Sequence, residues 1–173
     1  NPLRKHPDDE FPSLETLERI IKPSDKLCLW RKPFDPKDLK VKRYPLEVRQ
    51  KPSGVWYGVG LSWLDWVATE MPGWQHNYLY RITFDRKPIL KISTEGQLDS
   101  FTEEYAARSE RYGSSINWLD VSCDYAGIEI SPYIQDINAR LGTSSWYSTW
   151  DVASGCIWNP GIITSVEEVV LDA

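Results

Sequence analysis

The residues best suited to bind a planar ligand lie in one short stretch, Lys51–Trp66, with the sequence KPSGVWYGVGLSWLDW. Three glycines occur in it, and a residue without a Cβ lets a ligand or another backbone approach closely. The adjacent aromatic residues Trp56 and Tyr57 offer flat apolar faces. Strand neighbours face opposite ways, so core packing is expected for one of the two. The stretch therefore favours a pocket for a planar ring beside a chain reversal.

Two acidic residues are candidates for a carboxylate that would act on such a ligand. Glu129 lies between two isoleucines of an expected strand. Its side chain must face solvent, a cleft or a partner, because burying an unpaired carboxylate is costly. It is equally compatible with an ordinary outward-facing position on a half-exposed strand. Asp151 is the second candidate, and it could instead cap the turn into the final strand.

Histidine and cysteine chemistry finds little support. His6 and His76 lie in a lead-in and a turn, where neither is placed to activate a nucleophile. The three cysteines, Cys28, Cys123 and Cys156, form no C-x-x-C pattern, so no metal site is expected. Each lies in an apolar run and is predicted to be a small core residue. An odd number of widely spaced cysteines indicates a reducing, cytoplasmic location.

Charge and hydropathy limit the classes of partner that the chain is expected to bind. The formal net charge of −5 argues against a general affinity for nucleic acid or anionic membranes. No run of 18 apolar residues occurs, so no membrane partner is expected. The segment Lys37–Lys51 is locally basic. It could meet phosphates, or it could be a solvated loop.

The elements that must position these residues are short and mixed. Helices are predicted after an N-cap at Ser13, over 61–70, over 95–107 after a Thr94–Gln97 capping box, and from a cap at Ser115 to a stop at Gly127. Strands are predicted at 27–30, 55–58, 78–84, 89–92, 128–130, 153–158 and within 162–170. We expect a single α+β domain, 1–173, with a split, mainly antiparallel sheet flanked by helices. Residues 1–12 are expected to be a loosely packed lead-in.

Five motifs occur in a fixed order. They are a strand ending in a basic residue (Leu27–Arg31), G-[VL]-[WY]-[YF]-[GA] before a helix (Gly54–Gly58), a strand pair (Tyr78–Ile92), Y-x-G-I (Tyr125–Ile128) and C-I-W-N-P-x-x-I (Cys156–Ile163). This order resembles the ADP-ribosyltransferase superfamily, which includes bacterial mono-ADP-ribosylating toxins and poly-ADP-ribose polymerases. The resemblance covers about Lys26 to Val170. The run WDVASGCIW is similar to a box of phage and phage-defence members.

The resemblance implies a toxin-like mono-ADP-ribosyltransferase, a glycosyltransferase that uses NAD as its substrate and needs no metal. Arg31 matches the basic residue that holds the NAD ribose or phosphate, and its planar fork suits those oxygens. The NAD-binding region of the second strand matches Ser53, Gly54, Trp56 and Tyr57, and one of the two aromatic rings would stack on nicotinamide.

In the family a glutamate often begins the late strand, where it binds the ribose 2′-OH and stabilises positive charge as nicotinamide departs. Here that strand begins Ala-Ser-Gly-Cys, without a glutamate. Glu129 and Asp151 therefore both remain candidates for the catalytic carboxylate.

The implied partners are NAD, a protein or nucleic-acid acceptor and, for a toxin, an antitoxin. Lys37–Lys51 makes a nucleic-acid acceptor conceivable without deciding it. Two alternatives stay open: an inactive binding module on the same fold, and an RNase toxin, for which the two histidines are poorly placed.

Overall fold

The computed structural model describes residues 12–30, 32, 34, 43–74, 78–108, 112–135 and 143–169. All but the last residue of the expected lead-in lies outside the described residues. The same holds for Arg31, for His6 and His76, and for residues 37–42 of the basic segment Lys37–Lys51.

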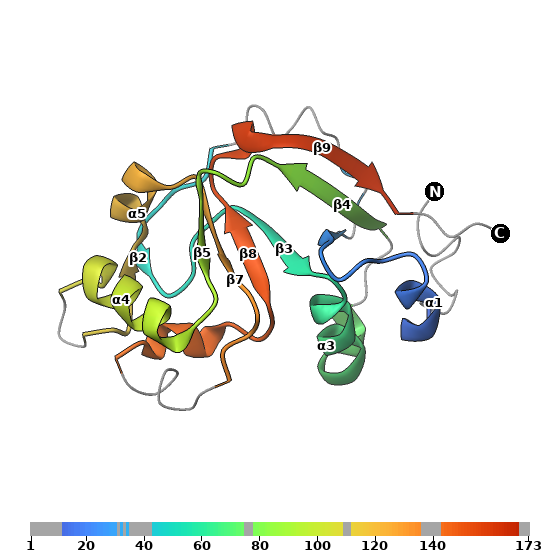
Figure 1. Ribbon diagram of the computed structural model, residues 1–173, viewed down its shortest axis with the longest axis horizontal. Helices are drawn as coiled ribbons and strands as arrows, with labels where there is room; N and C mark the ends of the chain where they lie inside the picture. The colour runs from blue at the N-terminus through green and yellow to red at the C-terminus, as the bar shows by residue number, and fades with distance from the viewer. Residues whose placement is uncertain are drawn as a thin grey trace.

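Seven strands of the described part of the chain form the central sheet. Side by side they are β5 (Ile89–Ile92), β7 (Gly127–Ile130), β8 (Ser154–Ile157), β3 (Val55–Val59), β1 (Lys26–Trp30), β4 (Tyr78–Phe84) and β9 (Ile163–Glu168). Only the β5–β7 pair is parallel, and the other five pairs are antiparallel. The expected α+β class and mainly antiparallel sheet are thus confirmed. Hydrogen bonding runs across all seven strands, whereas we expected a split sheet, and the sheet curls between its two ends (Figure 1).

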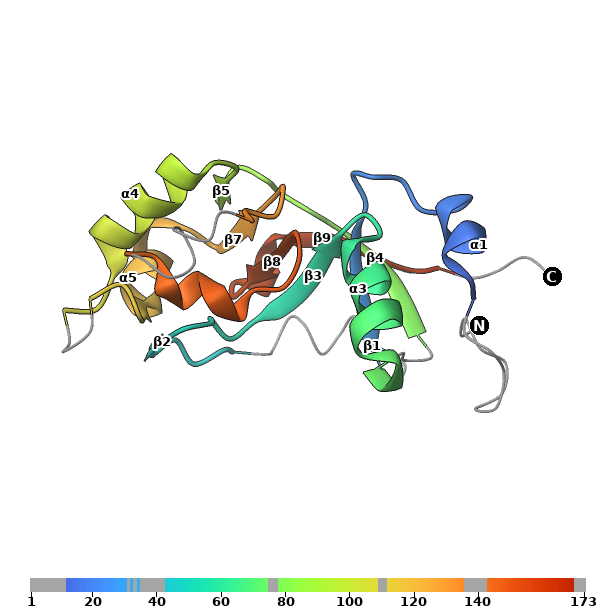
Figure 2. The same ribbon diagram turned by 90° about the horizontal axis from the view of Figure 1, so that it is seen from below.

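Two groups of helices flank the sheet. At one end lie α4 (Glu95–Tyr105) and α5 (Trp118–Asp124), and at the other lie α1 (Leu14–Glu18) and α3 (Ser62–Glu70) (Figures 1 and 2). The predicted caps of α1 and α4 are confirmed: Ser13 accepts a hydrogen bond from Thr16, and Thr94 and Gln97 form a capping box. In the described ranges, three 3₁₀ turns connect elements: η1 (Pro72–Trp74), η2 (Ser145–Thr149) and η3 (Pro160–Ile162).

The helix predicted from a cap at Ser115 to a stop at Gly127 is α5, and both predicted ends were wrong. The N-cap is Asn117, whose side chain accepts a hydrogen bond from the Asp120 backbone N–H, and not Ser115. The two residues before the helix form β6 (Ile116–Asn117), which pairs with β2 (Val48–Arg49) in a small second sheet. Gly127 does not end the helix but begins β7. A Cβ there would lie 2.7 Å from the Cys156 carbonyl oxygen, so the glycine permits close packing between strands.

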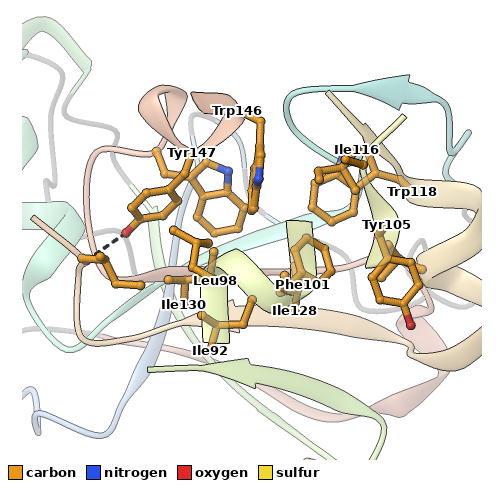
Figure 3. Packing of buried hydrophobic residues seen from close by; sticks show 14 of the residues in the cluster. Ile92, Leu98, Phe101, Tyr105, Ile116, Trp118, Ile128, Ile130, Trp146 and Tyr147 are labelled. Carbon is orange, nitrogen blue, oxygen red and sulfur yellow. Dashed lines mark hydrogen bonds between the residues drawn. The ribbon is translucent and has the colours of Figure 1, made fainter. Parts of the chain in front are cut away.

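The largest core cluster fills the space between α4, α5, η2 and the β5–β7 end of the sheet. Figure 3 shows Trp146 and Tyr147 facing Leu98 and Phe101 of α4, with isoleucines of β5 and β7 nearby. Two buried polar groups here are paired, as is usual in a low-dielectric interior, whereas the buried Trp150 indole N–H has no hydrogen-bond partner among the described residues. The Trp146 indole N–H donates to Thr102 Oγ1 at 2.8 Å, and the Ile134 N–H donates to the Tyr147 hydroxyl at 3.0 Å. These aromatic residues are structural.

The cysteines are all free, and two of the three belong to the core. Cys28 and Cys156 are buried as predicted, and burial raises the pKa of Cys28 to about 12, which keeps its thiol protonated. Cys123 is exposed, so the core prediction was wrong for it. It lies on the outer side of α5, which is too short for its apolar run to be buried on every side.

None of the helices in the described ranges is long and apolar enough to cross a bilayer. Within those ranges, no group of three or more His, Cys, Asp and Glu side chains is arranged to hold a metal ion.

Candidate active site

A cleft of about 310 Å³ opens where three neighbouring central strands, β1, β3 and β8, meet α3. This volume is at the lower end of the range for small-molecule sites, about 300–1,000 Å³. Its wall is formed by Leu27, Leu29, Lys51, Trp56, Tyr57, Gly58, Trp63, Trp150, Asp151, Val152 and Ser154. The strands bring together segments from the first third and the last quarter of the chain.

Trp56 is the central aromatic side chain of the cleft. Its ring is half-buried, and its centroid lies 4.9 Å from that of Trp150 in an edge-on contact. The Lys51 ammonium group lies 5.5 Å from the Trp56 ring centroid, within the range of a cation–π contact. Trp63 adds another indole from α3. It approaches because Gly58 has no side chain: a Cβ there would lie 2.6 Å from the Trp63 Cβ.

Asp151 brings a carboxylate to the same cleft. It is exposed and lies in the short segment between η2 and β8, next to Trp150. The first residue of α3 holds this segment in place, since Ser62 Oγ donates a hydrogen bond of 2.7 Å to the Ala153 carbonyl oxygen. The structure therefore brings Asp151 and Trp56 together in one wall.

Tyr57 and Glu129 meet on the opposite face of the sheet. Both are paired with Gly155 across β8, so they share a face, and the alternation of a strand places Trp56 on the other. The Tyr57 hydroxyl donates to Glu129 Oε1 at 3.1 Å, and both residues are buried. Tyr57 borders the cleft, yet its hydroxyl group points away from it. Core packing of one aromatic residue of the pair is thus confirmed, and the residue is Tyr57.

Two lysine ammonium groups offset the negative charge of Glu129. Lys26 Nζ lies 2.7 Å from Glu129 Oε1, and Lys91 Nζ lies 2.6 Å from Oε2. Burial raises the pKa of Glu129, but the hydrogen bonds and positive charges of Lys26 and Lys91 outweigh it, so the pKa is lower than the ordinary value. Burial beside this carboxylate raises the pKa of Tyr57, which keeps its hydroxyl protonated. The cluster is a partnered, ionised site on the far side of the sheet from Trp56.

Ser53 and Gly54 do not line the cleft. Ser53 Oγ accepts a hydrogen bond of 3.4 Å from Arg49. Gly54 packs against β8, where an added Cβ would lie 2.5 Å from the Ile157 carbonyl oxygen. Arg31 lies outside the described residues.

Sequence reasoning missed Trp150 and Ser154, and although Lys51 and Trp63 lie in the stretch singled out for the pocket, it gave neither of them a role there. The spacing of Trp63 after Gly58 was the one available signal, because a glycine facing a helix permits a bulky residue there.

The ionised state of Glu129 predicts a specific dependence of stability on pH. Because the folded pKa lies below the ordinary value of 4.5, the stabilisation is fully present above that pH and is lost as the pH falls through the folded pKa. We expect the difference in unfolding free energy between wild type and Glu129→Gln to shrink below pH 4.5, in urea titrations at several pH values. A difference independent of pH would contradict the ion pairs.

Gly155 is required by the Tyr57 ring. A Cβ at this position would lie 2.3 Å from the Tyr57 hydroxyl oxygen. We expect Gly155→Ala to destabilise the fold by about 1–3 kcal/mol through overpacking, as measured by chemical denaturation. Gly73→Ala is the matched control, since nothing lies within 4 Å of a Cβ there. Equal stabilities of the two variants would refute this packing argument.

Comparison with known proteins gives no further assignment: no family model, no curated protein and no solved structure matches the chain.

Proposed function

We propose that the protein is an NAD-dependent mono-ADP-ribosyltransferase. One observation carries the proposal: a single cleft combines the Trp56 ring with the Asp151 carboxylate. The sequence resemblance assigns NAD binding and catalysis to the first strand, the second strand and the start of the late strand. Those segments correspond to β1, β3 and β8, which are neighbours in the sheet.

The cleft fits one end of the dinucleotide. Its volume of about 310 Å³ is small for a site of this kind, so it would take the nicotinamide and its ribose rather than the whole molecule. Trp56 and Trp63 would hold the planar ring. Indole faces attract cations, and the pyridinium ring of NAD is positively charged. Lys51, at the rim of the same cleft, would complement a phosphate.

NAD, when bound, would supply the ADP-ribosyl group and nicotinamide as the leaving group. The role of Asp151 would be to lie against the positive charge that develops on the ribose. A carboxylate about 4 Å from such a charge contributes about 4 kcal/mol at an effective dielectric constant near 20. Glu129 is less suited, because two ammonium groups already offset its charge.

The test is to incubate the purified protein with NAD labelled in the adenylate part and a cell extract, and to measure nicotinamide release. We expect free nicotinamide and label on a macromolecule. Absence of both would refute the proposed function.

A catalytically inactive binding module is the second candidate. It is favoured by the serine at the start of β8, where the family often has a glutamate, and by the pairing of Glu129 with lysines. It predicts that NAD or a related nucleotide binds, as measured by calorimetry, and is recovered intact.

A further inference from the structure

Asp151 is an exposed residue between two buried ones. Trp150 before it is 1% exposed, and Val152 after it is 8% exposed. The Trp150 ring contacts the rings of Trp56 and Trp146, with centroids 4.9 and 6.0 Å away. The Asp151 carboxylate itself makes no hydrogen bond or ion pair with the described part of the chain. The backbone on both sides is thus anchored in the core, while the carboxylate stays available to a ligand.

Hydroxyl groups from two other parts of the chain hold the backbone on both sides of Asp151. Before it, the Tyr133 hydroxyl donates a hydrogen bond of 2.9 Å to the Trp150 carbonyl oxygen. After it, Ser62 Oγ donates a hydrogen bond of 2.7 Å to the Ala153 carbonyl oxygen. Tyr133 follows β7 and Ser62 begins α3, so the two donors come from elements that are far apart in the sequence.

Both donors are themselves fixed. The Tyr133 ring packs on that of Tyr147, with centroids 5.6 Å apart, and Tyr147 is fully buried and accepts a hydrogen bond from the Ile134 N–H. Ser62 lies close to β3 because Gly58 has no side chain: a Cβ there would lie 3.5 Å from Ser62 Oγ. Donors held in this way cannot follow a moving segment, so they restrict the backbone that carries the carboxylate.

Neither donor lines the cleft. Any effect of Ser62 or Tyr133 on a group held in the cleft would therefore be transmitted through the segment that contains Asp151. Ser154 is different. Its hydroxyl donates to the Val152 carbonyl oxygen at 3.0 Å, but Ser154 lines the cleft as well, so its replacement would change two things at once.

From these contacts we infer that Ser62 and Tyr133 are positioning residues, which hold the Asp151 carboxylate where positive charge develops on the ribose. This inference rests on the proposed function. The attraction between two charges falls with distance, and a displacement of about 1 Å can lower a rate about 100-fold. Removing either hydroxyl should lower kcat for nicotinamide release by about 10- to 100-fold. KM should stay within about twofold, because the residues that line the cleft are unchanged.

The first experiment compares Ser62→Ala and Tyr133→Phe with a matched control in steady-state kinetics with NAD. The control is Ser145→Ala, which also removes a half-buried hydroxyl that donates to a distant backbone carbonyl, that of Gly113 at 3.2 Å, away from the cleft. We expect kcat to fall in the first two variants only. Equal kcat values for Ser62→Ala, Tyr133→Phe and Ser145→Ala would overturn the inference.

The second experiment tests whether Ser62 acts through Asp151. When the carboxylate is replaced by an amide, its exact position no longer matters for charge stabilisation. The double variant Ser62→Ala/Asp151→Asn should therefore have the same kcat as Asp151→Asn alone, within about twofold. Losses that multiply would overturn the inference and leave the proposed function standing.

The third experiment needs no NAD. ¹⁵N relaxation gives the order parameter of the Asp151 backbone amide, which should be near the rigid value of about 0.85 in the wild type and in Ser145→Ala. It should be lower in Ser62→Ala and in Tyr133→Phe. An unchanged order parameter in both would overturn the inference even if NAD is cleaved. No release of nicotinamide by the wild type would instead refute the proposed function, and the positioning role with it.

Discussion

Under the proposed function, replacing Asp151 with asparagine should lower the rate of NAD cleavage by about 100- to 1,000-fold. A loss of this size is typical when one preorganised group that stabilises transition-state charge is removed. The amide keeps the size and shape of the side chain and loses its charge. The loss should appear in kcat more than in KM, because the charge on the ribose develops only as the bond to nicotinamide breaks.

The fold should tolerate this change. Asp151 is exposed, and substitutions of exposed residues usually alter stability by no more than about 0.5 kcal/mol. Asp120→Asn is the matched control, because it removes the same charge from an exposed position on α5, at the other end of the sheet. Nicotinamide release and the urea midpoint should be measured for both variants. Comparable activity of Asp151→Asn and Asp120→Asn would remove Asp151 from the mechanism.

Local patterns were sufficient to predict most of the secondary structure. The alternation of YLYRITF predicted β4 with its exact bounds, Tyr78–Phe84, because one face of that strand is buried. The capping box at Thr94 predicted the start of α4, because the two hydrogen bonds between Thr94 and Gln97 are local and do not depend on the rest of the fold. β2 and β6 could not be predicted. Each has two residues, and they exist only because they pair with each other across the fold.

The candidate site was predictable only in part. Sequence alone indicated that one of Trp56 and Tyr57 would face the core, but not which, since the answer depends on where α3 and β8 pack. The two ion pairs of Glu129 could not be predicted from the sequence either. Lys26 and Lys91 lie on β1 and β5, on either side of β7 in the sheet, and no local spacing connects them to Glu129.

The second large effect concerns stability. Replacing Glu129 with leucine should lower the free energy of unfolding by about 3–5 kcal/mol, because removing one partner of a buried ion pair leaves a charge without compensation. The loss of stability comes mainly from Lys26, whose side chain is 8% exposed and would keep a buried, unpaired charge. The Lys91 side chain is 53% exposed, so its ammonium group can be hydrated by water instead. The Tyr57 hydroxyl would lose its acceptor as well.

Two further variants decide whether this charge is the cause. Lys26→Met combined with Glu129→Leu should regain most of the lost stability in urea denaturation, since no buried charge then remains unpaired. Glu167→Gln is the control, because its ion pair with Arg81 is exposed at the glutamate (67%) and contributes at most about 1 kcal/mol. If Glu129→Leu were as stable as Glu167→Gln and yet failed to cleave NAD, the role of Glu129 would be catalytic. Glu129, and not Asp151, would then have the role that the proposed function gives to Asp151.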